Sequence, residues 1–145
     1  TTLFRSEIFD AISYDKGGCI LRMLEHYVGE TNFRKGLKQY LTKFKYKNAQ
    51  GQDLWNEIAK ASRMPVSDMV NSWLKQSGFP LVEIDQKGSN LYLKQKRYLL
   101  EYDKKFSKGQ WMIPLSIGLS QEISKKMFSK KSMTIKIPKK TSLSP

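Results

Sequence analysis

Apolar residues in the first half of the chain recur at intervals of three and four, which predicts four amphipathic helices. The first stripe leads to Gly29, a natural helix stop, and the second has Thr31 or Asn32 as its N-cap. The third helix ends before Arg63, and Pro65 suits the first turn of the fourth. The four stripes are Ile20, Leu21, Leu24, Tyr27 and Val28; Phe33, Leu37, Tyr40, Leu41 and Phe44; Leu54, Trp55 and Ile58; and Met69, Val70, Trp73 and Leu74.

The period of the pattern changes after Gly78 and Pro80, which end helical structure. Residues 81–84 lead into a turn at 87–90, and alternation over 91–97, 111–117 and 133–137 predicts further strands. Pro114 inside one of them indicates an edge strand or a bulge. We therefore predict an α+β fold, with helices in a domain of residues 1–78 and a small antiparallel β-sandwich in residues 79–145.

Composition supports a folded core and shows an uneven charge. Of 145 residues, 39% are hydrophobic and 12% aromatic, enough to exclude wholesale disorder. The formal charge is +13: residues 1–86 carry 12 Lys and Arg against 10 Asp and Glu, and residues 87–145 carry 14 against 3. In the second half the lysines alternate with apolar residues, which is typical of the solvated face of strands. The charge is therefore weak support for a nucleic-acid or anionic partner.

Localisation is predicted from two observations. No apolar run is long enough to span a bilayer, and no basic-then-apolar signal pattern opens the chain. The chain begins without methionine, as expected for a piece of a larger protein. Its single cysteine, Cys19, cannot form an internal disulfide, which favours a reducing compartment and a cytoplasmic protein.

Tyr14 is the strongest candidate for chemistry, because it lies just ahead of the long first helix. A phenol can donate a hydrogen bond to an oxyanion while it stays neutral at physiological pH. Asp10 is placed to cap the helix that carries it. Gly17 and Gly18 follow Lys16 without the spacing of a phosphate loop, so we expect them to allow close approach of a neighbouring helix.

Other distinctive residues have simpler structural interpretations. His26 lies in an amphipathic helix, where a surface or packing role is more common than metal ligation. Cys19 is expected to be a small buried hydrophobe, since nothing nearby indicates an activated thiol. Trp55 and Trp73 lie on apolar helix faces and are expected in the core.

An ordered series of motifs resembles the M1 family of zinc aminopeptidases, the gluzincins, including the cytosolic and archaeal branch with the tricorn-interacting aminopeptidases. The resemblance covers nearly the whole chain and is strongest up to Ile84. The series is Phe9-Asp10-x-Ile12-x-Tyr14-x-Lys16-Gly17, Arg22-Met23-Leu24, Gly29-Glu30-x-x-Phe33-Arg34-x-Gly36-Leu37, Tyr46-x-Asn48-Ala49, Asp53-Leu54-Trp55, Trp73-x-x-Gln76-x-Gly78-x-Pro80 and Trp111-x-Ile113-Pro114-Leu115.

The resemblance implies a fold and a chemistry. It implies the helical C-terminal part of a thermolysin-like catalytic domain, followed by a β-sandwich. In the family, two histidines of a His-Glu-x-x-His helix and a glutamate of the next helix hold zinc, which activates water. A tyrosine stabilises the tetrahedral intermediate, and the motif match places that role on Tyr14.

The chain departs from the family pattern where the metal is bound. It has one histidine, His26, and no His-Glu-x-x-His motif, so it offers no zinc ligand set and no cofactor-binding residues of its own. We therefore expect a piece of an aminopeptidase that holds the Tyr14 half of the site and is inactive alone. Its partners would be peptide substrates and the missing N-terminal catalytic part that carries zinc, with neither a nucleic acid nor a membrane.

Two other hypotheses compete with this one. A non-enzymatic basic module would bind single-stranded nucleic acid through residues 87–145, with Tyr92, Tyr98, Tyr102 and Trp111 stacking on bases. Against it, no nucleic-acid-binding signature is present, and Ile113 and Leu115 have the character of core residues. The third hypothesis is a protein-interaction platform, because the cut faces of a truncated enzyme expose apolar surface.

Overall fold

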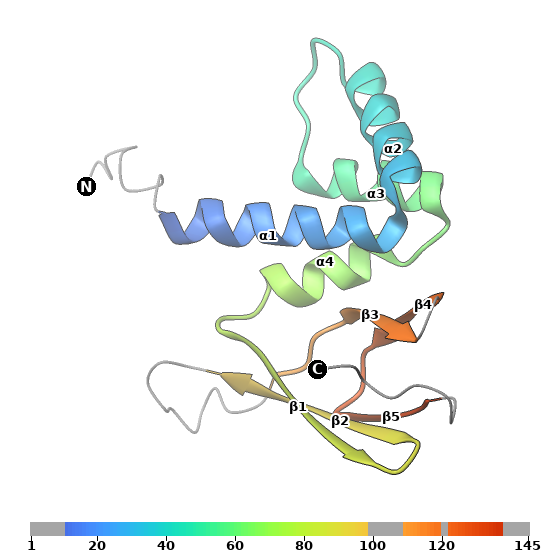
Figure 1. The fold of residues 1–145 in the computed structure, drawn as a ribbon. Coiled ribbons are helices and arrows are strands. Elements are labelled where there is room, and N and C mark those ends of the chain that lie inside the picture. The colour runs from blue at the N-terminus through green and yellow to red at the C-terminus, as the bar shows by residue number, and fades with distance from the viewer. Residues whose placement is uncertain (1–10, 99–108, 120–121, 138–145) are drawn as a thin grey trace, which may run out of the picture. The chain divides into compact units, whose positions relative to one another are not determined.

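The computed structural model describes residues 11–98, 109–119 and 122–137, and the chain divides into two compact units. The first unit comprises residues 1–70 and the second residues 71–145. Helices come first along the chain and antiparallel strands follow (Figure 1), which confirms the α+β class. The boundary between the two units falls between Val70 and Asn71, within the fourth helix. The predicted domains 1–78 and 79–145 stay a prediction.

The first unit is helical, as the apolar periodicity predicts. It contains α1 (Ala11–Val28), α2 (Glu30–Lys43), α3 (Gly51–Ser62) and the beginning of α4 (Val66–Leu74). The buried positions follow the expected helical spacing, so apolar burial explains where these helices form. The buried hydrophobic residues of this unit are Ile20, Leu24, Val28, Ile58, Val66, Met69 and Val70.

Helix ends follow the predicted signals at Gly29 and Arg63, but Pro65 precedes α4, which begins at Val66, and does not lie in its first turn as predicted. Gly29 separates α1 from α2 with a left-handed φ of 84°, and Arg63 ends α3 in the left-handed region at 57°. At the start of α3, the Gln50 N–H donates to Asp53 Oδ2 at 2.9 Å, and the Asp53 N–H donates to the Gln50 carbonyl at 3.0 Å. The predicted N-cap of α2 is wrong, because this helix begins at Glu30 directly after Gly29; Asn32 Nδ2 instead donates back to the Val28 carbonyl at 2.9 Å.

Helices α2 and α3 pack closely at a glycine. A Cβ on Gly36 would lie 2.6 Å from the Ile58 Cα, so only glycine allows this approach. A Cβ on Gly17 or Gly18 would meet nothing within 4 Å. The prediction that these two glycines allow a close helix approach therefore stays a prediction, and the close approach that the structure shows lies at Gly36.

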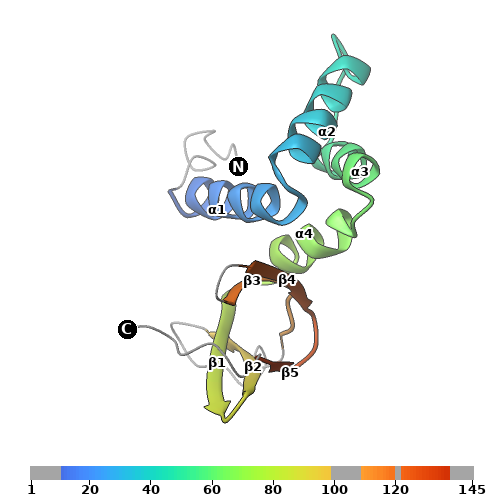
Figure 2. The same ribbon diagram turned by 45° about the vertical axis from the view of Figure 1, so that its right-hand side comes forward.

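The second unit contains two small antiparallel sheets. One sheet has the order β1 (Phe79–Lys87), β2 (Asn90–Tyr98), β5 (Ser132–Lys136), and the other pairs β3 (Ile113–Leu119) with β4 (Glu122–Phe128). Figure 2 shows the β3–β4 pair facing the three-stranded sheet. The predicted turn between β1 and β2 is confirmed, with Gly88 at a φ of 58°. Pro114 lies in a strand of the two-stranded sheet, as the edge prediction requires.

The two sheets share one apolar core, which supports the sandwich prediction. A buried amide ties the layers together: Gln95 Nε2 donates to the carbonyls of Trp111 and Lys130, and its Oε1 accepts the Trp111 backbone N–H at 2.9 Å. The core cluster contains Leu93, Trp111, Ile113, Phe128 and Ile135, with Trp73, Val82, Leu91, Leu115, Ile117 and Met133 packed against it. Ile113 and Leu115 are thus core residues, as predicted.

Candidate functional site

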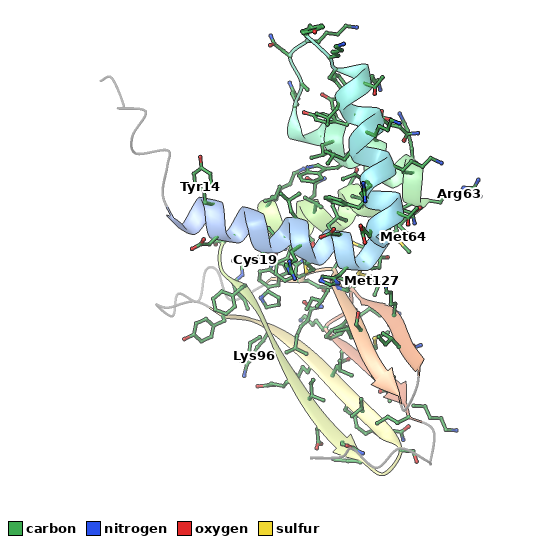
Figure 3. The ribbon with its side chains drawn as sticks, turned by 45° about the horizontal axis from the view of Figure 1, so that its top comes forward. Tyr14, Cys19, Arg63, Met64, Lys96 and Met127 are labelled. Carbon is green, nitrogen blue, oxygen red and sulfur yellow. The ribbon has the colours of Figure 1, made fainter. Side chains whose placement is uncertain are left out.

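Tyr14 lies within the first turns of α1, not just ahead of this helix as predicted, and projects outward from it (Figure 3). Its side chain is 59% exposed, so the phenol is presented on the surface of the first unit. The second tyrosine of this helix, Tyr27, is half-buried near the other end, and burial raises the pKa of its phenol. The structure therefore distinguishes the two phenols: Tyr14 is accessible and Tyr27 is a packed side chain.

Two glycines follow Tyr14 on the same side of the helix. Residues three and four positions along a helix share a face with the starting residue, and here these positions are Gly17 and Gly18. A Cβ on either glycine would meet nothing within 4 Å. The phenol thus stands next to a bare strip of helix that another polypeptide segment could cover. Asp10, the predicted cap of this helix, lies outside the described residues.

The metal-ligating residue types on α1 do not converge near Tyr14. His26 is exposed and lies twelve residues further along, or about 18 Å at the helical rise. Cys19 is also exposed, so the prediction of a buried cysteine is wrong: the buried row of α1 runs through Ile20, Leu24 and Val28, and Cys19 lies off it. Within residues 11–98, 109–119 and 122–137, no three His, Cys, Asp or Glu side chains could hold a metal ion together.

Several motif residues have structural roles in the second unit. Trp73 Nε1 donates to the Met112 carbonyl at 2.9 Å, and the Met112 N–H donates to Ser72 Oγ. Gln76 exchanges hydrogen bonds with the Gln110 backbone and accepts one from Arg97. These contacts hold the segment before β3 against the end of α4. Their role in stabilising the fold is enough to explain why Trp73 and Gln76 occur in the ordered series of motifs.

Tyr14 differs from Trp73 and Gln76 because its side chain is mostly exposed, so packing does not explain its presence in the motif. Tyr46, in the turn after α2, is also exposed, at 95%, and has a left-handed φ of 59° with Lys45 Nζ 5.0 Å from the centroid of its ring.

Leu41 is 60% exposed, so its predicted place on the buried stripe of α2 is wrong. The periodicity identifies helices correctly but does not say which part of a wide apolar stripe is covered.

The aromatic residues proposed for the nucleic-acid hypothesis do not form one exposed surface. The side chains of Tyr92 and Tyr98 are 42% and 41% exposed, but Trp111 is 1% exposed in the apolar core of the second unit. A side chain so deeply buried cannot stack on a base. Tyr98 instead stacks on Phe79 at 4.9 Å between ring centroids, and Tyr102 lies outside the described residues.

In the part of the chain that the structure describes, no helix is both long and apolar enough to cross a membrane.

Comparison with known proteins gives a consistent result. Residues 5–73 match the Peptidase family M1 domain. The chain is 47% identical over 94 residues to the leucyl aminopeptidase of Saccharolobus solfataricus, which covers 65% of this chain and 12% of that protein. It is 43% identical over 112 residues to tricorn protease-interacting factor F2 of Thermoplasma volcanium, covering 77% and 14%. It is 42% identical over 112 residues to aminopeptidase M1-C of Oryza sativa, covering 77% and 12%. The chain therefore spans about one seventh or less of these relatives.

Proposed function

This chain belongs to peptidase family M1, and we propose that it is part of a zinc-dependent aminopeptidase that removes N-terminal residues from peptides. The names of the relatives support aminopeptidase activity for the parent protein. Because the chain spans 12% to 14% of these relatives, the activity is assigned to the parent and not to residues 1–145 alone. A cytoplasmic parent fits the single cysteine, which is exposed and free.

Tyr14 is the residue of this chain to which we assign a catalytic role. Its phenolic O–H would donate a hydrogen bond to the oxyanion of the tetrahedral intermediate when the peptide carbonyl is attacked. The observation that carries this assignment is the exposure of Tyr14 beside the bare strip at Gly17 and Gly18. A segment of the parent lying on that strip would close the phenol into a site.

The described residues do not fit a zinc site, so we place the zinc ligands in the parent outside residues 1–145. Residues 1–145 contain one histidine, and a catalytic zinc site takes about three protein ligands and an open position. The chain's own contribution would be the donor that faces the reacting carbonyl. Zinc dependence is therefore a property that we propose for the assembled enzyme.

Substitution of Tyr14 by phenylalanine in the parent enzyme tests the assignment. Tyr14→Phe removes one hydroxyl and leaves the ring, so we expect kcat to fall about 100-fold or more, as for loss of an oxyanion donor. KM should change much less, because this hydrogen bond strengthens in the transition state. Steady-state kinetics on an amino-acid anilide measures both constants.

Tyr27→Phe is the matched control, since it removes a hydroxyl from the same helix at a half-buried position. We expect this variant to keep kcat within a few-fold of the unmodified enzyme. A Tyr14→Phe enzyme with nearly unchanged kcat would remove Tyr14 from the mechanism. Equal losses in both variants would point to a general effect on α1.

A further inference from the structure

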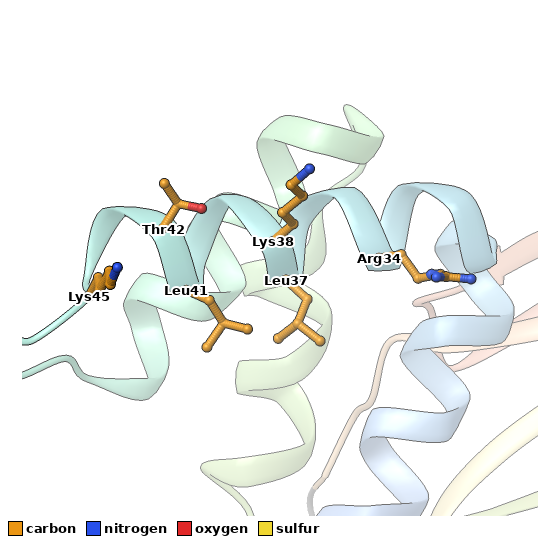
Figure 4. Close-up of a pocket in the computed structure, with 6 residues that line it drawn as sticks. All are labelled: Arg34, Leu37, Lys38, Leu41, Thr42 and Lys45. Atoms are coloured by element: carbon orange, nitrogen blue, oxygen red, sulfur yellow. The ribbon is translucent and has the colours of Figure 1, made fainter.

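The outward face of α2 carries a hollow of about 490 Å³ (Figure 4). Five of its six lining residues belong to this helix, and Lys45 lies in the turn that follows it. The lining residues are Arg34, Leu37, Lys38, Leu41, Thr42 and Lys45. The hollow therefore lies along α2 and the turn after it, in the first unit.

The spacing of these residues has the geometry of a helix-packing groove. They form two rows with a spacing of four residues, 34–38–42 and 37–41–45. Side chains in such rows make ridges, and the groove between two ridges is where a ridge of a second helix packs. Figure 4 shows Leu37 and Leu41 on one side of α2 and Lys38 and Thr42 on the other, as two flanking rows require. The shape favours a helix as the occupant.

The contacts that α2 makes with α3 lie on another face of the helix. Gly36 and Lys43 contact α3, through Ile58 and Glu57, and they lie roughly 180° around α2 from Leu41 and Lys45 at 100° per residue. Leu41 is consequently 60% exposed. An isolated exposed leucine is ordinary, but two leucines along a groove form a surface suited to burial.

The charges around the groove are of one sign. Arg34, Lys38 and Lys45 line it, and no carboxylate is among its lining residues. Arg34 lies 3.5 Å from Glu30, but both side chains are more than 70% exposed, so this pair neutralises little of the local field. A partner that places carboxylates beside its apolar row would complement this rim.

We propose that the groove binds an amphipathic helix of the parent polypeptide, from outside residues 1–145, whose leucine-type row is flanked by Asp or Glu. The proposal rests on the proposed function, because it takes the chain to be part of a longer enzyme. The relatives are about seven times longer than the chain or more, which leaves most of the polypeptide to supply this helix. Its apolar row would fill the groove between the two rows and pack against Leu37 and Leu41, and its carboxylates would face Lys38 and Lys45.

Site-specific photo-crosslinking in the full-length parent tests this contact directly. Leu41 is replaced by p-benzoylphenylalanine, and the control carries the same group in place of Gln39, which is exposed but does not line the groove. We expect the probe at position 41 to cross-link within the same polypeptide, to an acid-flanked helix outside residues 1–145. The yield from position 39 should be at least fivefold lower. Mass spectrometry of the cross-linked peptides identifies the site.

Charge reversal provides a second readout. In the enzyme with the probe at position 41, the double substitution Lys38→Glu and Lys45→Glu should lower the cross-link yield at least fivefold. Lys35→Glu reverses an exposed charge of the same helix outside the groove and should leave the yield unchanged.

Four results would overturn the proposal: equal yields from positions 41 and 39, attachment to a separate polypeptide, attachment to a segment without carboxylates, or a yield insensitive to charge reversal. Peptidase activity is measured on the same preparations. Absent activity with the expected cross-link would contradict only the proposed function. Normal activity without the cross-link would contradict only the groove.

Discussion

Glu57 is a nearly buried carboxylate of α3 that binds two lysines. Its Oε1 accepts hydrogen bonds at 2.8 Å from Lys43 of α2 and from Lys60 of its own helix. The hydrogen bonds from Lys43 and Lys60 hold the pKa of this carboxyl below its ordinary value near 4.5. The same contact raises the pKa of Lys43 above 10.5. The ionised pair therefore joins α2 to α3 over a wide range of pH.

We predict an acid-dependent loss of stability that Glu57→Gln removes. A carboxyl with a lowered pKa in the folded state stabilises the protein above pH 4.5, and this contribution disappears as the pH falls through the folded value. The variant should thus melt several degrees lower than the unmodified chain at pH 7. The difference should shrink as the pH falls below 4.5, as measured by circular dichroism melting.

Glu83→Gln is the matched control for this experiment. Glu83 also has a lowered pKa, because Lys96 donates a hydrogen bond to it, but its side chain is 48% exposed. Exposed ion pairs contribute little to stability, so Glu83→Gln should shift the pH 7 midpoint less than Glu57→Gln. A constant difference between the Glu57→Gln variant and the unmodified chain from pH 7 to pH 3 would contradict the role of ionised Glu57.

At the scale of elements, the packing of α2 on α3 depends on Gly36. We predict that Gly36→Ala destabilises the chain by about 1–3 kcal/mol, because the new methyl group would overlap the Ile58 backbone at 2.6 Å. Gly17→Ala should have the opposite effect, since its methyl group meets open space and alanine favours the helix interior by about 0.5–1 kcal/mol. Urea unfolding followed by the helical signal measures both. Equal effects of the two substitutions would contradict the proposed close packing.

The elements were largely predictable because their signals are local. Gly29 and Arg63 end helices, and Gly88 turns β1 into β2, each through backbone conformations that the local sequence indicates. Alternation along β2 also predicts correctly that Lys94 and Lys96 are exposed while Leu93 is buried. Strand β4 was not predicted, because Lys125 and Lys126 interrupt a weak alternation.

Features that depend on tertiary contacts could not be predicted from the sequence. The close approach at Gly36 and the exposure of Cys19 and Leu41 depend on which helix faces which. Alternation places Gln95 on the same face as Leu93, and it is 4% exposed, but the two separate segments that its amide binds are set by tertiary contacts. For the candidate site, the motif identified Tyr14, and its exposure came only from the structure.

At the scale of the whole molecule, the proposed function divides the active site: the chain would supply a hydrogen-bond donor and the remaining polypeptide would supply the metal. Neither part should catalyse alone, because the donor stabilises charge that forms only when the carbonyl is attacked. We predict that residues 1–145 with added zinc do not hydrolyse an amino-acid anilide. Mixing them with the parent protein lacking this segment should restore turnover, measured by release of the anilide chromophore.

The restored activity should depend on the donor that the chain brings. Complementation with Tyr14→Phe should give about 100-fold less turnover than with the unmodified chain, whereas Tyr27→Phe should restore it within a few-fold. The comparison separates assembly from chemistry, because both variants keep the aromatic ring and the same helix. Turnover by residues 1–145 and zinc alone would show that the chain assembles a metal site from its own side chains. That outcome would contradict the division of the active site between two parts of the polypeptide.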